Sequence, residues 1–594
     1  MARKPPYPKH VTALKSLKKE RKPFIVADLE TIQIPIDDPT DTKPIEDPTD
    51  TNQIVDQMDT IPIEDQIEYP SDTILKKKQT DTNPKEDPTE ALTKMHVAYA
   101  AGFLVVKPGE DISAVPDFKT ETYFSEEYNL LYPDFKDKST QMLFNFIERL
   151  AVVANKTKIR TVYFHNLARF DGILLMKYLT IHGNKYSFKT IMRNLTLYEF
   201  SVYLGQKLVF SLRDSYFLLT ASLDELGKTL CPELGSKGSI DHDKLRVEDL
   251  HPKKNELLDY MKQDIRLLGG VMLKAQDIYW RKFKVDFKSC LTLSSLALTI
   301  FRMRYYDPNS WPIHIPSRNE DTFIRRGYYG GHADVYKPIG INLYIYDANS
   351  LYPYVMKSFP MPGGVPVWHD NLEGKDISEL FGFIEACVVC PTTMTRPFLP
   401  YRDKKTGTLL FPTGEFVGVY FSAELEYAQK LGYKIQPLRG YFFENNNTSP
   451  FDSFVEYLYE SRQQAKKSGD KAMAYVYKLI MNSLYGRFGI NPESTITEIC
   501  ERKRYDILLH SVKKLVYGEK LSDKYLMVNY KINTVHADNS EWNPPKISAV
   551  HLSAAITAYA RIYMYKHISR HDCVYTDTDS AVLERPLPED EISD

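Results

Sequence analysis

The sequence predicts a mixed α/β (α+β) fold in two regions, residues 24–275 and residues 276–594. Two short apolar runs, Phe24–Ala27 and Val97–Val106, have the composition and length of β-strands. Between residues 255 and 276, apolar side chains recur at helical spacing and indicate a long helix that closes the first region. Strand-like runs that end in acidic residues recur in the second region, so we expect helices and strands in both.

Composition excludes several classes of protein. The 594 residues are enough for roughly three to five domains, and 43% hydrophobic residues with 12% aromatic residues exclude a wholly disordered or fibrous chain. Six cysteines are too few for a disulfide scaffold. No apolar stretch approaches the ~20 residues of a transmembrane helix. The basic N-terminal segment, residues 1–23, has no apolar core and does not resemble a secretory signal.

Residues 33–90 differ from the rest of the chain. They contain a degenerate nine-residue repeat, Ile-Pro-Ile-Asp-Asp-Pro-Thr-Asp-Thr, whose first copy begins at Ile34. The segment carries a net charge of −11, whereas the other 536 residues carry +9. Recurrent proline, high charge and low hydrophobicity predict a disordered insertion in the turn of a β-hairpin. The overall net charge of −2 therefore does not exclude a nucleic-acid ligand for the remaining body.

Acidic residues stand at strand and helix ends in the first region. Asp28 and Glu30 are two residues apart on the first predicted strand, so their side chains share one face. Asp171 lies at the junction between a loop and a predicted helix over residues 172–179.

The long predicted helix adds Tyr260 and Asp264, which are four residues apart and therefore share a face. Together with the preceding acids, Asp264 forms a candidate site for hard divalent cations, which prefer oxygen ligands. Two such ions about 3.5–4 Å apart can support phosphodiester hydrolysis. Tyr260 would then orient the attacking water.

A second candidate site lies in the second region. Asp347 ends a predicted strand, and Asp577 and Asp579 are two residues apart on another predicted strand that begins at Cys573. Acids on neighbouring strands can hold two ions that activate a primer hydroxyl and bind a nucleoside triphosphate. This is the chemistry of nucleotidyl transfer.

One predicted helix, which ends at Gly486, places Lys478, Asn482 and Tyr485 on one face. The lysine can pair with a triphosphate as a point charge. The tyrosine ring can stack against the nascent base pair and crowd out a ribose 2′-hydroxyl. An amphipathic core helix would explain the leucines of this segment but not its polar stripe.

These segments resemble known motifs. Asp-x2-Ser-Leu-Tyr-Pro at Asp347, Lys-x3-Asn-Ser-x-Tyr-Gly at Lys478 and Tyr-x-Asp-Thr-Asp-Ser at Tyr575 resemble motifs A, B and C of family B DNA polymerases. The acidic segments of the first region resemble the Exo I, II and III motifs of their 3′–5′ proofreading exonuclease. The motif order resembles the protein-primed branch, which includes polymerases of small Bacillus phages and of linear mitochondrial plasmids of fungi.

The resemblance implies an RNase H-like exonuclease domain followed by a palm and fingers domain. It implies DNA primer-template and dNTPs as substrates, a terminal protein as primer, and two Mg²⁺ or Mn²⁺ ions per active site. It also implies a mitochondrial location, and we expect a monomer without membrane association. Regions that contact the terminal protein are expected within residues 362–450 and 490–545.

The residues implied fall into three sets. The catalytic set comprises Asp28, Glu30, Asp171, Asp264, Tyr260, Asp347, Asp577 and Asp579, of which all but Tyr260 and Asp577 are metal ligands. The nucleotide-binding set comprises Tyr352, Lys478, Asn482 and Tyr485. The DNA-binding set comprises Asn166, Phe170, Ser222, Leu223, Tyr328, Gly330, Gly331, Thr557 and Arg561. The exonuclease lysine of the family has no assigned match, and Lys253 and Lys254 are candidates.

The chain departs from the family pattern after motif C. It continues for 14 residues beyond Ser580, where the family continues with a Lys-x-Tyr motif and a thumb, so the thumb is expected to be missing. The alternative function is therefore a truncated relic that retains exonuclease activity or only binds DNA or terminal protein. A viral reverse transcriptase would also offer paired acids, but it would not explain the upstream exonuclease acids.

Overall fold

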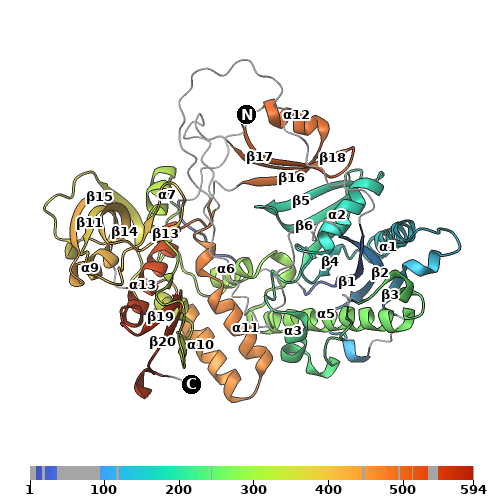
Figure 1. The fold of residues 1–594 in the computed structure, drawn as a ribbon, viewed down its shortest axis with the longest axis horizontal. Coiled ribbons are helices and arrows are strands. Elements are labelled where there is room, and N and C mark those ends of the chain that lie inside the picture. Colours follow the sequence, from blue (N-terminus) through green and yellow to red (C-terminus); the bar gives the residue numbers. More distant parts are fainter. Residues whose placement is uncertain are drawn as a thin grey trace.

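The computed structural model describes nine parts of the chain (Figure 1): residues 9–15, 20–35, 94–114, 119–241, 244–444, 448–491, 495–510, 513–532 and 546–592. From residue 36 onward, the predicted disordered insertion lies outside the described residues. Its expected first residues, 33–35, instead belong to a strand, because β1 continues to Pro35 and pairs there with Lys94.

The first region is built on a ten-stranded sheet with the order β17-β18-β16-β5-β6-β7-β4-β1-β2-β3 (Figure 1). Its strands are β1 (Phe24–Pro35), β2 (Lys94–Val106), β3 (Glu121–Phe124), β4 (Thr161–Phe164), β5 (Ser187–Arg193), β6 (Thr196–Leu204), β7 (Lys207–Asp214), β16 (Ile496–Glu501), β17 (Lys513–Lys520) and β18 (Tyr525–Ile532). The antiparallel pairing of β1 with β2 confirms the predicted hairpin. The last three strands belong to the second half of the chain, so the two regions share one sheet.

Helices cover both faces of this sheet. They are α1 (Phe135–Thr157), α2 (Asp171–His182), α3 (Leu223–Leu230), α4 (Val247–Leu250) and α5 (Lys254–Phe283). Alternate residues of β1 face opposite cores: Val26 packs with Met261 of α5, whereas Ala27 packs with Phe146 of α1. The predicted long helix is confirmed, and it extends past the boundary expected at residue 275.

A smaller sheet with the order β8-β19-β20-β9 forms the centre of the second region. Its strands are β8 (Ala333–Val335), β9 (Tyr344–Asp347), β19 (Cys573–Asp577) and β20 (Ser580–Leu583). Around it lie α6 (Leu293–Arg304), α7 (Arg318–Arg325), α8 (Leu351–Ser358) and α13 (Val550–Ile568). All residues of α13 from Val550 to Arg561 are buried, so this helix forms part of the core.

Two further units complete the second region. A sheet with the order β10-β15-β11-β14 consists of β10 (Gly363–His369), β11 (Gly382–Cys390), β14 (Gly414–Phe421) and β15 (Lys434–Glu444), accompanied by α9 (Ser422–Lys430) and the ribbon β12 (Tyr401–Arg402) and β13 (Leu409–Leu410). The helices α10 (Asp452–Lys467) and α11 (Lys471–Asn482) lie side by side at the bottom of Figure 1, and α12 (Arg502–His510) lies at the top. Short 3₁₀ helices span Ile112–Ala114, Ser125–Tyr128, Pro232–Leu234, Phe287–Ser289, Ile377–Glu379, Tyr485–Arg487 and Glu589–Glu591. Among the described helices, none combines the length and apolarity needed to cross a membrane.

The N-terminal segment is docked onto the second region, which the sequence did not predict. His10 forms an isolated antiparallel bridge with His314. The backbone N–H of Val11 donates to the carbonyl of Ile313 at 2.9 Å. The Tyr306 hydroxyl donates to the carbonyl of Val11 at 3.1 Å. Since Val11 is only 1% exposed, this segment is firmly packed against the second region.

Replacing Val11 with aspartate should destabilise the protein, because a charge would be buried without a partner. We expect a loss of about 2 kcal/mol or more in the free energy of unfolding, measured by denaturant titration. Lys9→Asp at an exposed position of the same segment is the matched control and should have little effect. Equal effects of the two substitutions would show that the segment is not docked.

Candidate active sites

The first carboxylate cluster lies between β1 and α5. One oxygen each of Asp28, Glu30 and Asp264 lies within 4.8 Å of the other two. The predicted strand face of Asp28 and Glu30 and the predicted helix face of Asp264 therefore meet. The residue opposite Asp28 on β2 is Gly102, where an added Cβ would lie 2.9 Å from Cδ1 of Ile265 on α5. A side chain at this position would push α5 away from the strand acids.

Asp171 begins α2 next to this cluster, as the sequence predicts for a loop-to-helix junction. It is only 3% exposed, and its Oδ1 makes no hydrogen bond with any described residue. Burial raises the pKa of Asp171, and the nearby negative charge of Asp28 raises it further. A buried carboxylate oxygen without a protein donor is the kind of atom that a bound cation would satisfy.

The carboxylates hold their protons unusually strongly. Burial and the charge of Asp264 raise the pKa of Asp28 to about 7. Burial and then the charge of Asp28 raise the pKa of Glu30 and of Asp171 well above the usual range. Removing carboxylates from water disfavours their charged forms, and each negative charge disfavours the next. The site therefore favours a proton or a divalent cation, and its oxygen donors fit Mg²⁺ or Mn²⁺.

Lys237 is the cation that the sequence did not identify. Its Nζ donates to Oδ2 of Asp264 at 2.9 Å and lies 5.8 Å from the ring centroid of Tyr260. Burial alone would lower the pKa of Lys237, but the charge of Asp264 and the hydrogen bond to it raise that pKa. One lysine cannot neutralise four carboxylates, so the cluster keeps a negative charge that suits divalent ions.

The two lysines expected from the sequence lie elsewhere. Lys253 pairs with Asp249 at 3.6 Å, and Lys254 pairs with Glu127 at 2.8 Å. The sequence offered both only as candidates, and neither is the lysine that pairs with Asp264. Lys237 instead lies in a loop, where residue spacing carries no information about which side chains share a face. Its only local signal is the pair of nearby glycines, Gly235 and Gly238, which is too weak to select it.

The loop that precedes Asp171 is organised by the buried carboxylate of Asp214. This carboxylate accepts backbone N–H groups of Asn166 at 2.9 Å, Ala168 at 2.9 Å and Tyr216 at 2.8 Å. Asn166 adopts a left-handed backbone with φ 67°, which asparagine tolerates. The loop thus holds Asn166 and Phe170 beside the acids, although the structure does not test their predicted contact with DNA.

Two other predicted DNA-binding residues support a helix. The Ser222 hydroxyl accepts the backbone N–H of Glu225 at 3.3 Å and so caps α3. The next residue, Leu223, is buried in the core. Ser222 itself is exposed, so it remains accessible to a ligand.

The second acidic site lies at the turn between β19 and β20. Asp577 ends β19, Thr578 adopts a left-handed backbone with φ 57°, and Asp579 lies in the turn. The expectation that both acids share one strand was therefore wrong, because the chain reverses after Asp577. Asp347 ends β9, where it pairs with Ser580, and the N–H of Ala348 donates to the carbonyl of Asp579 at 2.7 Å. The backbone pairing thus places the three acids near one another at one end of the small sheet.

The segment Tyr328–Gly331 packs against this turn. An added Cβ at Gly331 would lie 2.6 Å from Oγ1 and 2.8 Å from Cα of Thr578, whereas nothing lies within 4 Å of one at Gly330. The N–H of Thr578 also donates to the carbonyl of His332 at 3.0 Å. Glycine at position 331 therefore lets the segment approach the acidic turn.

Arg561 holds the same segment from behind. Its Nη1 donates to the carbonyls of Tyr329 at 2.8 Å and Gly330 at 2.7 Å, and its Nε pairs with Glu424 at 2.8 Å. Arg561 and Thr557 are 3% and 2% exposed. The structure thus shows a role for Arg561 that the sequence did not predict. Its buried side chain supports the loop of Tyr329 and Gly330.

The predicted stripe of nucleotide-binding residues is divided between two elements. Lys478 is exposed on α11 and Asn482 is its last residue. Tyr485 lies beyond the helix in a 3₁₀ turn, so the expectation of one continuous helix was wrong. Tyr485 stacks with Tyr352 at a centroid distance of 4.2 Å, which brings the two predicted aromatic residues together.

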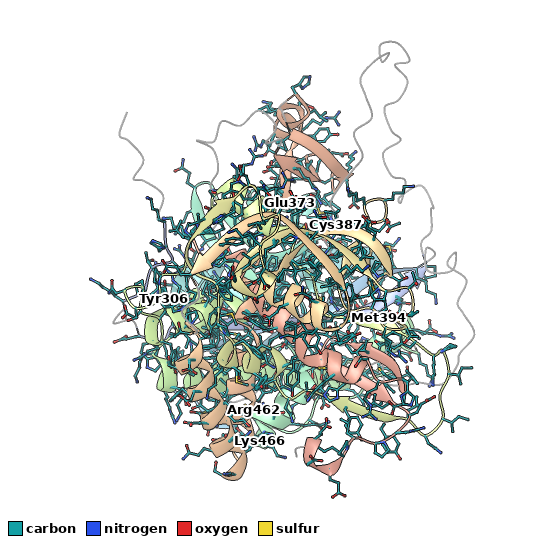
Figure 2. The ribbon with its side chains drawn as sticks, turned by 90° about the vertical axis from the view of Figure 1, so that its left-hand side faces the viewer. Tyr306, Glu373, Cys387, Met394, Arg462 and Lys466 are labelled. Carbon is teal, nitrogen blue, oxygen red and sulfur yellow. The ribbon has the colours of Figure 1, made fainter. Side chains whose placement is uncertain are left out.

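Arg462 is a further residue that the sequence reasoning missed. Its Nη1 donates to Oγ of Ser350, in the turn after Asp347, at 3.3 Å. Figure 2 shows Arg462 and Lys466 on α10, where they are one helical turn apart. Two basic residues at this spacing were the available signal. Arg462 places positive charge next to the segment that carries Asp347.

A sequence profile described as DNA polymerase type B, organellar and viral, matches residues 154–254 and 251–573. A probable DNA polymerase of Neurospora intermedia is 30% identical over 484 residues, which are 73% of this chain and 48% of that protein. One of Podospora anserina is 31% identical over 430 residues, 63% of this chain and 35% of that protein. The chain thus spans about half the length, or less, of these relatives.

Two solved structures have the same fold. The match to Phi29 DNA polymerase in an orthorhombic crystal form has a TM-score of 0.59 and 19% sequence identity. It covers 84% of this chain and 79% of that polymerase chain. The same polymerase complexed with primer-template DNA gives 0.59 at 19% identity, with 83% and 78% covered. This likeness confirms the mixed α/β architecture.

Removing one charge from the first cluster should stabilise the ion-free protein at alkaline pH. Because the folded state raises the pKa of Asp28 to about 7, the folded state binds more protons than the unfolded state between about pH 4 and 7. Its stability therefore falls as pH rises through that range. We expect Asp28→Asn to unfold about 2 °C or more above the unsubstituted protein at pH 8 without divalent ions, measured by calorimetry.

Mn²⁺ should reverse the order, because it stabilises the protein that retains all the carboxylates. Asp590→Asn removes a charge from an exposed position and should change neither measurement. An unchanged or lower unfolding temperature for Asp28→Asn at pH 8 would contradict the electrostatic strain inferred for the cluster.

Proposed function

Because the chain belongs to the organellar and viral type B DNA polymerases, we propose that it is a DNA-directed DNA polymerase with a 3′–5′ exonuclease. The observation that carries the proposal is the presence of two separate acidic sites, one on each sheet, each assembled from residues of the matching family motif. The buried cluster of Asp28, Glu30 and Asp264 suits hydrolysis, and the open turn of Asp577 and Asp579 suits a bulky primer and nucleotide.

In the polymerase site, Mg²⁺ or Mn²⁺ ions would lower the pKa of the primer hydroxyl and neutralise the leaving pyrophosphate. Asp347 and Asp579 would hold them. Lys478 and Arg462 provide positive charge for the triphosphate. The stacked rings of Tyr352 and Tyr485 form a flat wall against which the new base pair can lie.

In the exonuclease site, two ions would supply an activated nucleophile and stabilise the leaving oxygen. Asp28, Glu30, Asp171 and Asp264 would hold them. Tyr260 would orient the attacking water, and Lys237, which pairs with Asp264, would hold that carboxylate in place. Phe170 and the loop around it would position the end of a single strand.

We also propose protein-primed replication of a linear plasmid-like DNA in mitochondria, carried out by a monomer. The similarity to probable DNA polymerases of Neurospora intermedia and Podospora anserina supports a fungal host for this DNA. A DNA-directed DNA polymerase of Enterobacteria phage PRD1, 25% identical over 431 residues, supports the viral branch. The alternative is a protein that hydrolyses or binds DNA without synthesis. The exposure of Asp347 and the partial exposure of Asp577 and Asp579 favour testing that alternative directly.

Two substitutions should separate the activities. Asp347→Asn should lower incorporation of labelled dNTP on a primed template by roughly a hundredfold or more, because it removes a ligand of the transferring site. It should leave hydrolysis of single-stranded DNA intact. Glu30→Gln should give the reverse result.

The unsubstituted protein is assayed with each metal in the same experiment. Hydrolysis without any incorporation, with either Mg²⁺ or Mn²⁺, would support the alternative function. Neither activity with either ion would sink both enzymatic proposals.

A methyl group at position 331 should disturb the polymerase turn. Gly331→Ala places Cβ against Thr578, and overpacking of this kind costs about 1–3 kcal/mol. We expect primer extension to fall about tenfold while hydrolysis is unchanged. Gly330→Ala is the matched control, since its Cβ meets no atom within 4 Å. Equal extension by both variants would contradict the role of this close approach.

A further inference from the structure

A buried ion pair joins two helices that lie far apart in the sequence. Glu424 lies in the first turn of α9, and Arg561 lies on α13. Nε of Arg561 donates to Oε1 of Glu424 at 2.8 Å, and the two side chains are 2% and 0% exposed. Glu424 belongs to none of the motifs recognised in the sequence. The pair nevertheless connects the unit of β14 and α9 to the core of the second region.

The carboxylate of Glu424 depends on this arginine. Among the described residues, Arg561 is its hydrogen-bond partner, and Oε2 of Glu424 is buried without another. A buried carboxylate is unfavourable without a counter-charge. The partial positive charge at the start of α9 compensates it only in part. An effect of this carboxylate on the polymerase site is therefore transmitted through Arg561.

The guanidinium group of Arg561 can transmit such an effect because it is planar. While Nε is held by Glu424, Nη1 donates to the carbonyls of Tyr329 at 2.8 Å and Gly330 at 2.7 Å. The donors of a guanidinium form a fixed fork. Anchoring Nε therefore sets the direction of Nη1, and with it the position of two consecutive carbonyl groups.

The segment held in this way contacts the acidic turn through its backbone. Gly331 follows the two carbonyls, and an added Cβ there would lie 2.8 Å from Cα of Thr578. The N–H of Thr578 donates to the carbonyl of His332 at 3.0 Å. The ring of Tyr329 stacks on Tyr420 of β14 at a centroid distance of 5.8 Å. Because the contact with Thr578 has no flexible side chain to absorb a shift, movement of the segment moves the turn.

We propose that Glu424 is a positioning residue of the polymerase site, which acts through Arg561 on the segment Tyr328–Gly331 and thereby fixes the turn of Asp577 and Asp579. The inference rests on the proposed polymerase function for its activity test. In this role the Glu424 carboxylate touches neither DNA nor nucleotide. It orients the guanidinium group, and the loop carries the effect to the acids.

The first test compares two buried carboxylates that each pair with an arginine. Glu424→Gln keeps the shape of the side chain and removes its charge. Asp572→Asn is the matched control, since Asp572 is 2% exposed, accepts Nε and Nη2 of Arg570 at 2.9 Å each, and lies at the other end of β19 from the acidic turn.

Glu424→Gln should lower primer extension about tenfold, because small displacements of reacting groups are costly. Hydrolysis of single-stranded DNA by the same sample should be unchanged, which also shows that the variant folds. Asp572→Asn should change extension less than twofold. Equal losses of extension in the two variants, or loss of both activities with Glu424→Gln, would show a general structural role and overturn the inference.

A double substitution tests the route. Gly331→Ala disturbs the same contact with Thr578 directly, and substitutions that act through one contact are not additive. In a Gly331→Ala background, Glu424→Gln should therefore lower extension less than twofold further. A further loss as large as in the unsubstituted protein would show that Glu424 does not act through this segment.

Amide hydrogen exchange gives a readout that needs no activity. The N–H of Thr578 is bonded to the carbonyl of His332, and loosening of the segment opens that bond. Glu424→Gln should speed exchange of this amide about tenfold, whereas Asp572→Asn should not change it. If the unsubstituted protein incorporates no dNTP, the polymerase proposal fails, while these exchange rates still decide the role of Glu424. If it incorporates dNTP and exchange at Thr578 is unchanged by Glu424→Gln, the inference fails alone.

Discussion

Mutual repulsion among the buried carboxylates of Asp28, Glu30, Asp171 and Asp264 is the constraint on which the first region depends. Three elements, β1, α2 and α5, converge to bring these groups out of water, and Lys237 compensates only part of their charge. Such an arrangement is unfavourable without protons or cations. The small residues Gly102 and Ala100, opposite Asp28 and Glu30 on β2, let α5 approach the strand that carries these acids.

The second acidic site is built differently. Asp347 is exposed, and Asp577 and Asp579 are partly exposed at a tight turn. Water compensates their charges, so the local backbone rather than burial determines their placement. Gly331 and the carbonyls held by Arg561 support that turn from one side. A site of this kind leaves room for a large substrate, whereas the buried cluster admits only a narrow one.

The sequence predicted what local periodicity controls. The strand period of two placed Asp28 beside Glu30, and the helical period placed Tyr260 beside Asp264. Residues whose position depends on chain reversal or on loops were not predicted: Asp579 lies in a turn, Tyr485 lies past the end of α11, and Lys237 lies in a loop. Long-range pairing was equally invisible. No local pattern shows that β16 joins β5, or that the segment around Val11 bridges to Ile313.

These long-range contacts link the two regions of the chain. Strands β16 to β18, which follow the motif of Lys478, extend the sheet that carries Asp28. The N-terminal segment docks next to α7, which leads directly into the segment of Gly331. The two acidic sites thus belong to one connected body.

The central claim is that the carboxylate cluster exchanges protons for divalent cations. Calorimetric titration of Mn²⁺ at pH 7 in buffers of different ionisation enthalpy measures the number of protons released. Since burial and neighbouring charges raise the pKa of Asp28 to about 7 and raise those of Glu30 and Asp171 well above their usual range in the ion-free protein, we expect release of about one proton or more, falling toward zero as pH rises. Mn²⁺ binding without proton release at pH 7, or no binding at all, would contradict the claim.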